Sequence, residues 1–318
     1  MIMNAPLKCE QIKKTILTFT LLFAIGINVK AQQEPMYTQY MFNGMATNPA
    51  YIAMDEMLAV TMLTRHQWVG FDGAPNTQTI SFHTPYKTSN TFYGAILLRD
   101  NIGEVISQTG GNLNLTRRLR IGDISWLALG VNAGVSYYSA LYRTKNVPSP
   151  SVDFDNTFID ERGNRVNIGM GLMFFNKKYY FGLSSPHFYY RDVSDPRRSY
   201  PPTAYRPTFL MQTGAIFNVS PDIKFRPSIL GKYVDGSPAQ FDVNTNFLLK
   251  EQFWIGTSYR YLDSFSVLAS VYLTPTMLFG YSYDLPNNNI NSARKSSHEL
   301  MFQFRLPVKG RDPIACFF

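Results

Sequence analysis

The chain has 318 residues and a formal net charge of +8; 15% of its residues are aromatic, and only 16% are charged. This length is enough for one large domain or two ordinary ones. The basic residues are scattered along the chain, so the charge gives no indication of a nucleic-acid partner.

Residues 1–31 are predicted to be a secretory signal peptide. A basic start precedes an apolar run over residues 16–29, and Val29-Lys30-Ala31 fits a cleavage site before Gln32. The apolar run is too short and too close to the N-terminus to favour a permanent helical span. Residues 1–31 contain four lysines and one glutamate, so removal of this peptide lowers the net charge to +5. Because later apolar runs are also too short, the abundance of Tyr, Phe and Gly favours a membrane β-barrel over a soluble domain.

The exported chain keeps one of the two cysteines, Cys316. A single cysteine forms no internal disulfide, so Cys316 makes either an intermolecular bridge or none. It lies in residues 309–318, which we expect to be a periplasmic C-terminal tail.

Residues 32–56 have no regular apolar period, and Pro35, Gly44 and Pro49 interrupt any element. Strand-like residues begin at Met57. Such a segment is typical of a plug ahead of a β-barrel, but an ordinary loop before a strand in a soluble β protein has the same pattern.

Residues 57–308 form a series of strand-length runs in which apolar and polar residues alternate. In residues 241–250 the apolar Phe241, Val243, Phe247 and Leu249 lie at alternate positions and therefore on one face, while the other face is mostly polar. The sequence predicts an all-β fold, an antiparallel outer-membrane β-barrel of about fourteen strands. The predicted strands are 57–69, 77–87, 91–101, 106–120, 124–142, 164–177, 179–192, 207–219, 223–235, 239–250, 253–262, 265–274, 277–285 and 297–308.

The lengths of the connections support a barrel. The long ones are 143–163, 192–206 and 286–296. When the connections between consecutive strands are numbered along the chain, these are the fifth, seventh and thirteenth, which are all odd. If the N-terminus is periplasmic, these connections are extracellular and the short even-numbered turns are periplasmic, which is the rule for outer-membrane barrels. A soluble sandwich has no reason to sort its loops in this way.

From the sequence we expect no catalytic residues, no metal site and no cofactor site. Ser81 and His83 point to the same face of one strand, but such pairs are common by chance and lack an orienting group. Four acidic residues in the connection 143–163 lack the spacing of a calcium loop; they are Asp153, Asp155, Asp160 and Glu161. Gly169 and Gly171 lie in a predicted strand and indicate close backbone packing.

Three ordered blocks carry a family resemblance. They are Tyr37-x-Gln39-Tyr40-Met41-Phe42-Asn43, Asn48-Pro49-Ala50-Tyr51 and the run from Arg65 to Pro75 with Gln67, Trp68 and Phe71. Together they resemble the opening of the PorP/SprF family of outer-membrane proteins of the type IX secretion system. The resemblance extends loosely over the mature chain, including the cysteine near its C-terminus.

The resemblance implies a non-enzymatic component that assists the secretion or surface attachment of adhesins, with a role in gliding motility. It implies partners in the periplasmic ring, in peptidoglycan-linked lipoproteins and among secreted adhesin clients, besides the lipid of the outer membrane. It marks Arg65 and Gln67 as candidates for contact with a partner or with the plug; the other interpretation pairs Arg65 internally and places Trp68 in an aromatic girdle. An alternative function is a transporter for hydrophobic small molecules, because some such barrels carry Asn-Pro-Ala in an N-terminal hatch, as in Asn48-Pro49-Ala50.

Overall fold

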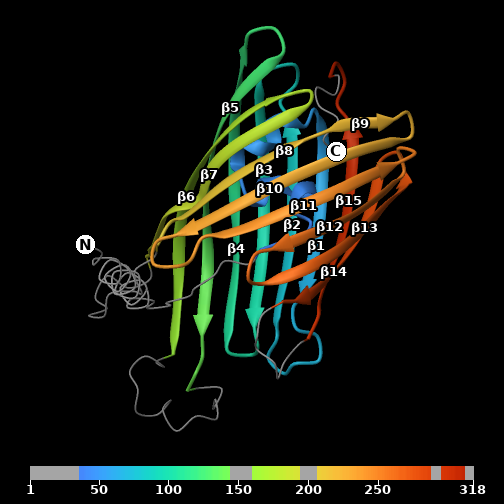
Figure 1. Ribbon diagram of the computed structural model, residues 1–318. Coiled ribbons are helices and arrows are strands. Elements are labelled where there is room, and N and C mark those ends of the chain that lie inside the picture. The colour runs from blue at the N-terminus through green and yellow to red at the C-terminus, as the bar shows by residue number, and fades with distance from the viewer. Residues whose placement is uncertain (1–35, 144–159, 194–205, 288–294, 312–318) are drawn as a thin grey trace, which may run out of the picture.

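The computed structural model describes residues 36–143, 160–193, 206–287 and 295–311. In these ranges three short 3₁₀ helices precede a 15-stranded sheet (Figure 1). The helices are η1 (Tyr40–Phe42), η2 (Gly44–Ala46) and η3 (Pro49–Met54). The strands are β1 (Met57–His66), β2 (Pro75–Pro85), β3 (Thr91–Ile102), β4 (Ile106–Ile121), β5 (Ser125–Ala140), β6 (Glu161–Asn176), β7 (Tyr179–Asp192), β8 (Thr208–Ala215), β9 (Phe217–Ser220), β10 (Ile223–Val234), β11 (Gln240–Leu249), β12 (Phe253–Arg260), β13 (Ser264–Thr274), β14 (Met277–Pro286) and β15 (Ser297–Pro307).

The sheet closes into a barrel. Every pairing is antiparallel, and β15 pairs with β1 to complete the ring. The short strands β8 and β9 both pair with β10 and are separated only at Ile216, so they occupy one place in the wall. The barrel therefore has fourteen strand positions around its wall, and the predicted fold, an antiparallel barrel of about fourteen strands, is confirmed.

Apolar side chains of the strands face outward and polar ones face inward, as the sequence predicts. On β11, Val243 and Phe247 are 44% and 41% exposed, whereas Asp242, Asn244 and Asn246 are buried inside. Apolar side chains thus cover the outside of the wall and polar ones face the lumen, as a membrane barrel requires. Within the described residues, no helix is long and apolar enough to cross a membrane.

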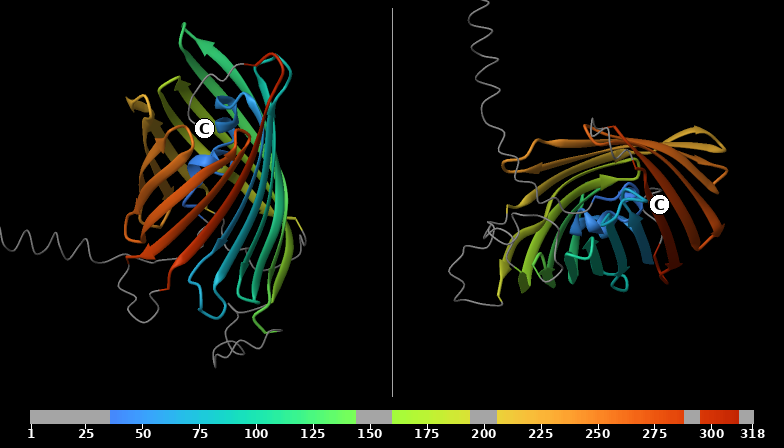
Figure 2. Two further views of the ribbon diagram at one scale, coloured as in Figure 1. Left: turned by 90° about the vertical axis from the view of Figure 1, so that its right-hand side faces the viewer. Right: turned by 90° about the horizontal axis from the view of Figure 1, so that it is seen from below.

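The wall has unequal height. Strands β4, β5 and β6 each have 16 residues, whereas β12 has 8 and β11 has 10. Figure 2 shows the long strands rising beyond the short ones. Strands β5, β7 and β14, which precede the three longest connections, all end on the side of the barrel away from the start of β1. The barrel rule therefore assigns the start of β1 to the periplasmic end and its finish at His66 to the outer end.

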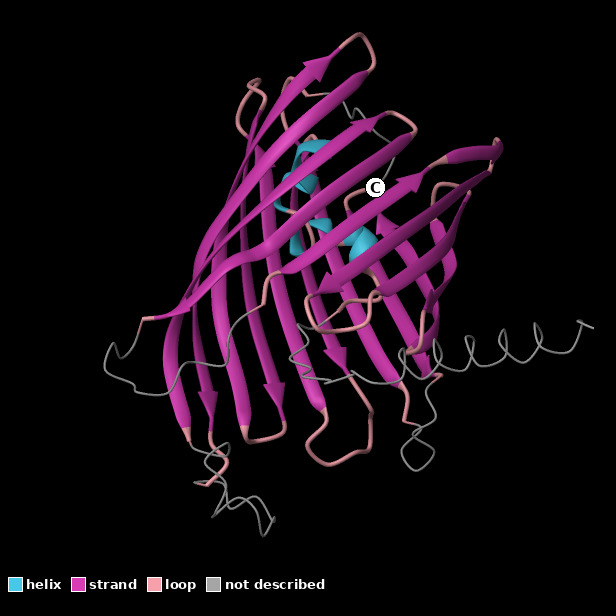
Figure 3. Cartoon of the chain, turned by 60° about the vertical axis from the view of Figure 1, so that its left-hand side comes forward, coloured by secondary structure: helices cyan, strands magenta, loops and turns pink. Residues whose placement is uncertain are grey.

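The segment Met36–Glu56 lies inside the barrel, where Figures 2 and 3 show its 3₁₀ helices enclosed by the strands. Its side chains are almost all buried, including the polar Gln39 and Asn48, which are 0% exposed. The expected plug is therefore present in the fold, and we use "plug" below for Met36–Glu56.

One predicted boundary is wrong in a way that affects the candidate residues. Strand β1 ends at His66 rather than at residue 69, because Trp68 takes a positive φ of 46° and the chain turns there. The predicted signal peptide, Cys316 and most of the C-terminal tail lie outside the described residues. Asp153 and Asp155 also lie outside them.

Candidate functional site: the plug in the lumen

The outer end of the plug is held by a buried carboxylate. Glu299 of β15 accepts hydrogen bonds from the backbone N–H groups of Thr38 and Gln39 at 2.9 and 2.8 Å. Arg65 of β1 lies beside it, with 3.1 Å from Nη1 to Glu299 and 2.6 Å from Nη2 to Asp284. Arg65 Nη1 also donates to the Thr38 hydroxyl at 2.9 Å. We call these five residues the outer anchor.

The outer anchor stabilises the plug because its hydrogen bonds are charge-assisted and screened from water. Two consecutive backbone N–H groups share one carboxylate, which is an anion-binding geometry of the backbone. Arg65, Glu299 and Asp284 are each less than 5% exposed. A buried carboxylate pair is tolerated because one guanidinium contacts both members. Arg65 is thus paired internally and contacts the plug at the same time, so both interpretations of this residue apply.

The middle of the plug contacts lumen-facing side chains through single hydrogen bonds. The Ser81 hydroxyl donates to Asn43 Oδ1 at 2.8 Å, and Gln303 Nε2 donates to the Phe42 carbonyl at 3.0 Å. The two tyrosines of the first family block are held by Thr79, Ser228 and Asn244. Phe42 packs edge-on against Trp254 with ring centroids 5.8 Å apart.

Arg226 is a fully buried cation whose partners come from the plug and from aromatic rings. Its Nη2 donates to the Met41 carbonyl at 3.0 Å, and its guanidinium lies 5.5 Å from the ring centroids of both Phe42 and Trp254. Among the described residues no carboxylate lies within ion-pair distance of it. Its charge is therefore stabilised by a plug carbonyl and by π faces, and loss of the plug would remove the Met41 carbonyl and the Phe42 ring.

Asn48-Pro49-Ala50 fits against glycines of the wall. Asn48 caps η3, since its Oδ1 accepts from the Ala50 N–H at 2.9 Å, and Pro49 occupies the first helical position. Asn48 Nδ2 donates to the Leu172 carbonyl at 3.1 Å. A Cβ on Gly171 would come 2.0 Å from Asn48 Oδ1, and one on Gly130 would come 2.4 Å from the Ala50 nitrogen. These glycines leave the space that the plug occupies.

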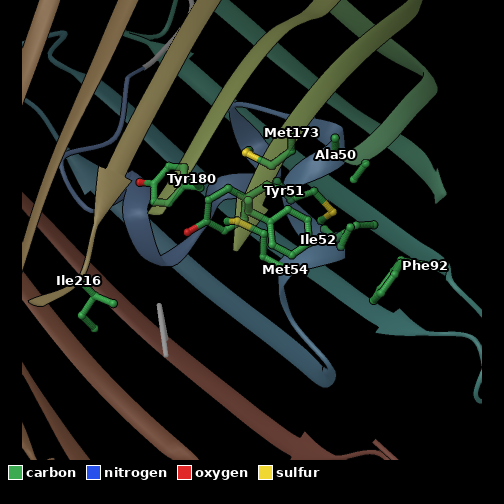
Figure 4. Close-up of a cluster of buried hydrophobic side chains, with 12 residues drawn as sticks. Ala50, Tyr51, Ile52, Met54, Phe92, Met173, Tyr180 and Ile216 are labelled. Atoms are coloured by element: carbon green, nitrogen blue, oxygen red, sulfur yellow. The ribbon is translucent and has the colours of Figure 1, made fainter. Parts of the chain in front are cut away.

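An apolar cluster fills the space between η3 and the wall (Figure 4). Ala50, Tyr51, Ile52 and Met54 come from the plug. The labelled wall residues are Phe92, Met173, Tyr180 and Ile216. Burial of each large apolar side chain contributes about 1.5–3 kcal/mol, so this cluster holds the plug together with the polar contacts.

The periplasmic end of the plug is held by its own two carboxylates. Asp55 contacts His83 Nε2 at 3.0 Å and Arg305 Nη2 at 2.7 Å. Glu56 contacts Arg118 Nη1 at 2.5 Å and Arg311 Nη1 at 2.6 Å. We call these six residues the inner anchor. Arg311 follows β15, so the inner anchor ties the start of the C-terminal tail to the plug.

Asp55 remains ionised in this environment. Burial raises the pKa of its carboxyl, but the Arg305 charge and the hydrogen bond and charge of His83 outweigh burial and hold the pKa below its usual value. A charged Asp55 is therefore the form that the inner anchor binds.

Within the described residues, none of the hydrogen bonds, ion pairs or ring contacts that hold the plug involves Gln67, Trp68 or Phe71. They lie in the turn between β1 and β2, where Trp68 is 44% and Phe71 51% exposed. The backbone N–H of Trp68 donates to Ser297 Oγ at 3.2 Å, and Lys295 Nζ donates to the Gly70 carbonyl. This block therefore joins the β1–β2 turn to the start of β15. Of the predicted residues, Arg65 and those of the first two blocks converge on the lumen, and these three do not.

Several residues of the site were absent from the sequence-based candidates. They are Asp55, Glu56, Arg118, Arg226, Asp284, Glu299, Arg305 and Arg311. Most are charged and lie on lumen-facing positions of alternating strands, which is the signal that could have identified them. Ser81 and His83 share a face as predicted, but each holds the plug: Ser81 through Asn43 and His83 through Asp55.

The fold and this interior define a class: an outer-membrane-type β-barrel whose lumen is filled by its own N-terminal segment. The model of the family described as "Type IX secretion system membrane protein PorP/SprF" matches residues 29–304, and the chain belongs to this family. The protein is accordingly a barrel of the outer membrane, of a family that is not enzymatic in kind.

Solved structures of other barrels resemble this chain at low identity. Omp33 of Acinetobacter baumannii is 11% identical, with a TM-score of 0.45 and coverage of 80% of this chain and 100% of that one. The monoaromatic hydrocarbon channel CymD is 11% identical, with a TM-score of 0.47 and coverage of 88% and 94%. The toluene transporter TodX of P. putida is 9% identical, with a TM-score of 0.45 and coverage of 83% and 94%. No curated protein matches the chain significantly.

Proposed function

We propose that this protein assists the secretion or surface attachment of adhesins and other proteins that carry a C-terminal secretion domain. It does so as a non-enzymatic component of the type IX secretion system, and it supports gliding motility where its clients are motility adhesins. The observation that carries the proposal is the family match over residues 29–304.

The filled lumen supports a docking role rather than a conducting one. The plug contacts the wall from Thr38 near the outer end to Glu56 at the periplasmic end. A barrel of fourteen strands is wider than its own side chains can fill, and here the plug supplies the missing volume. A polypeptide client then has no path through this barrel, so we infer that it is handled on the surface of the barrel.

The proposed partners are the periplasmic ring, peptidoglycan-linked lipoproteins of the secretion system and the clients themselves. The periplasmic rim, where Arg311 joins the tail to the plug, is the part of the described chain nearest to such periplasmic partners. A pull-down of the tagged protein in gentle detergent, followed by mass spectrometry, tests these partners.

A deletion strain tests the function itself. We expect loss of adhesin secretion, restored by the intact gene, together with normal uptake of hydrophobic small molecules. Normal secretion with impaired uptake would contradict the proposal and favour the transporter alternative. The plug is tested separately: deletion of residues 35–47 should produce a large rise in single-channel conductance of the purified protein in planar bilayers. Unchanged conductance with loss of partner binding would instead make this segment a docking site.

A further inference from the structure

One arginine stands in the lipid-facing surface of the wall. Arg117 of β4 is exposed, and its neighbours on the outer face of the same strand are the exposed Leu115 and Leu119. Opposite Arg117 on β5 lies Leu129, which is exposed as well. A charge on the lipid face of a barrel is unfavourable unless the side chain reaches a counter-ion or the polar edge of the membrane. The surroundings of Arg117 therefore favour an anionic partner on the outer face.

The protein itself supplies Arg117 with a hydroxyl group rather than a carboxylate. Arg117 Nη1 donates to the side chain of Thr91, the residue opposite it on β3, at 2.7 Å. None of the ion pairs between described residues involves Arg117. A guanidinium has five N–H donors in a fixed plane and suits a phosphate group. The donors that Thr91 does not use are therefore suited to a phosphate at the membrane surface.

The turn between β2 and β3 brings a second cation to the same part of the wall. The Tyr86 backbone N–H donates to the Thr91 carbonyl at 2.8 Å, so Tyr86, Thr91 and Arg117 form one row across the wall. Lys87 follows Tyr86 in the turn, and its Nζ lies 5.4 Å from the Tyr86 ring centroid. Two strand spacings of about 4.8 Å separate the ends of this row. The long side chains of Lys87 and Arg117 can span that distance to reach one phosphate.

Aromatic side chains place this row at the periplasmic edge of the lipid layer. Tyr86 and Tyr93 are both exposed, and their rings pack edge-to-face with centroids 5.7 Å apart. Tyrosines on the outer face of a membrane protein mark the interface between lipid and water. The β2–β3 turn lies at the end of the barrel that is assigned to the periplasm. A phosphate bound beside it therefore belongs to a lipid of the periplasmic leaflet.

The inner anchor lies on the other face of the same part of the wall. Arg118 follows Arg117 and points inward, where its Nη1 contacts Glu56 of the plug at 2.5 Å. Arg311 Nε donates to the Lys87 carbonyl at 2.6 Å, and Arg311 Nη1 contacts Glu56 at 2.6 Å. The β2–β3 turn therefore joins the two cations of the outer face to the carboxylate that fixes the periplasmic end of the plug.

We propose that Arg117 and Lys87 bind the phosphate of one anionic phospholipid of the periplasmic leaflet, and that this lipid stabilises the plug in its closed position. The headgroup restricts the β2–β3 turn from outside, while Arg311 holds the carbonyls of Lys87 and Ser89 from inside. Two cations select an anionic headgroup over a zwitterionic one. A ligand that binds only the closed arrangement shifts the equilibrium toward it. This site goes beyond the proposed role in secretion and does not depend on it.

Native mass spectrometry of the purified protein tests lipid binding, with phosphatidylglycerol and phosphatidylcholine of identical acyl chains as probes. We expect the protein to retain one phosphatidylglycerol, and Lys87→Gln with Arg117→Gln should lower this retention at least tenfold. Lys177→Gln with Lys178→Gln is the matched control, because it removes the same charge from exposed residues of another periplasmic turn; it should keep the lipid. Equal retention of the two lipids by the unmodified protein, or equal loss in the two variants, would overturn the proposal.

Hydrogen exchange tests the coupling to the plug. In nanodiscs of phosphatidylcholine, added phosphatidylglycerol should slow backbone exchange at residues 50–56 at least threefold in the unmodified protein and in the control. Lys87→Gln with Arg117→Gln should show no such difference, although it should migrate as a folded barrel in heat-modifiable gels. Exchange at residues 50–56 that does not respond to phosphatidylglycerol in the unmodified protein would refute the coupling, whether or not the variant folds. Either failure leaves the proposed function in secretion intact.

Discussion

Removal of the charge at Glu299 should release the outer end of the plug. In Glu299→Gln the side chain keeps its size but presents only one acceptor oxygen and no charge to Thr38, Gln39 and Arg65. Two charge-assisted hydrogen bonds to the plug backbone, at 2.9 and 2.8 Å, become one neutral bond or none. Hydrogen bonds to charged groups contribute about 1.5–3 kcal/mol each.

The expected loss is about 3–4 kcal/mol of plug binding, which corresponds to a change of about 10²- to 10³-fold in the population with a displaced plug. Arg65 keeps Asp284 at 2.6 Å, so the wall retains an ion pair and the barrel should still assemble. Single-channel recording in planar bilayers should show frequent openings that the unmodified protein lacks.

Glu251→Gln is the matched control. Glu251 contacts Lys224 at 2.5 Å, but its side chain is 59% exposed. Neither residue belongs to the plug or to its two anchors. An exposed pair contributes about 0–1 kcal/mol, so conductance should not change. Equal conductance of Glu299→Gln and the unmodified protein, with both barrels folded by heat-modifiable migration on gels, would refute the outer anchor.

Four further predictions concern the plug and the wall. Gly130→Ala places a Cβ against the plug backbone and should raise conductance, measured in the same bilayers. Because the folded pKa of Asp55 is lowered, the contribution of Asp55 to the inner anchor is fully present above the ordinary Asp value of about 4 and is lost as the pH falls through the lowered value. Acid-induced opening should therefore be smaller in Asp55→Asn, which already lacks this contribution at pH 7. Val243→Arg should impair assembly by about 2–4 kcal/mol if it lies near the membrane midplane, whereas Asn244→Ala should assemble normally in a heat-modifiable gel assay. N-terminal sequencing of the purified protein should give Gln32 as the first residue of the mature chain.

Position 244 tolerates a smaller side chain but not a larger one. Alternation correctly predicts that position 244 faces the lumen, and an arginine there would be acceptable in an open, water-filled channel. The side chain is instead 0% exposed, and its Nδ2 donates to the Tyr40 hydroxyl at 3.0 Å. An arginine at this position would displace the plug, so alternation alone does not reveal which lumen positions are available to a larger side chain.

The barrel itself was predictable from the sequence, because each strand carries its own local signal. Period-2 alternation and turn residues placed the fourteen strands close to their observed bounds, and the predicted strand 207–219 corresponds to β8 and β9 together. The break at Ile216 was not predicted. Its side chain turns inward to the apolar cluster, and that contact depends on the plug rather than on the strand.

The plug contacts could not be predicted in the same way, because they join residues that are distant in sequence. Glu299 meets Thr38 across 261 positions and Arg305 meets Asp55 across 250, and no local pattern specifies such pairs. What the sequence does supply is a constraint: a charge on a lumen face needs a partner, because burial without one is unfavourable. In an open channel water would satisfy Glu299 and Arg118. In this barrel the plug backbone and its terminal carboxylates satisfy them, so the lumen charges and the plug are parts of one arrangement, and neither is stable in its present form without the other.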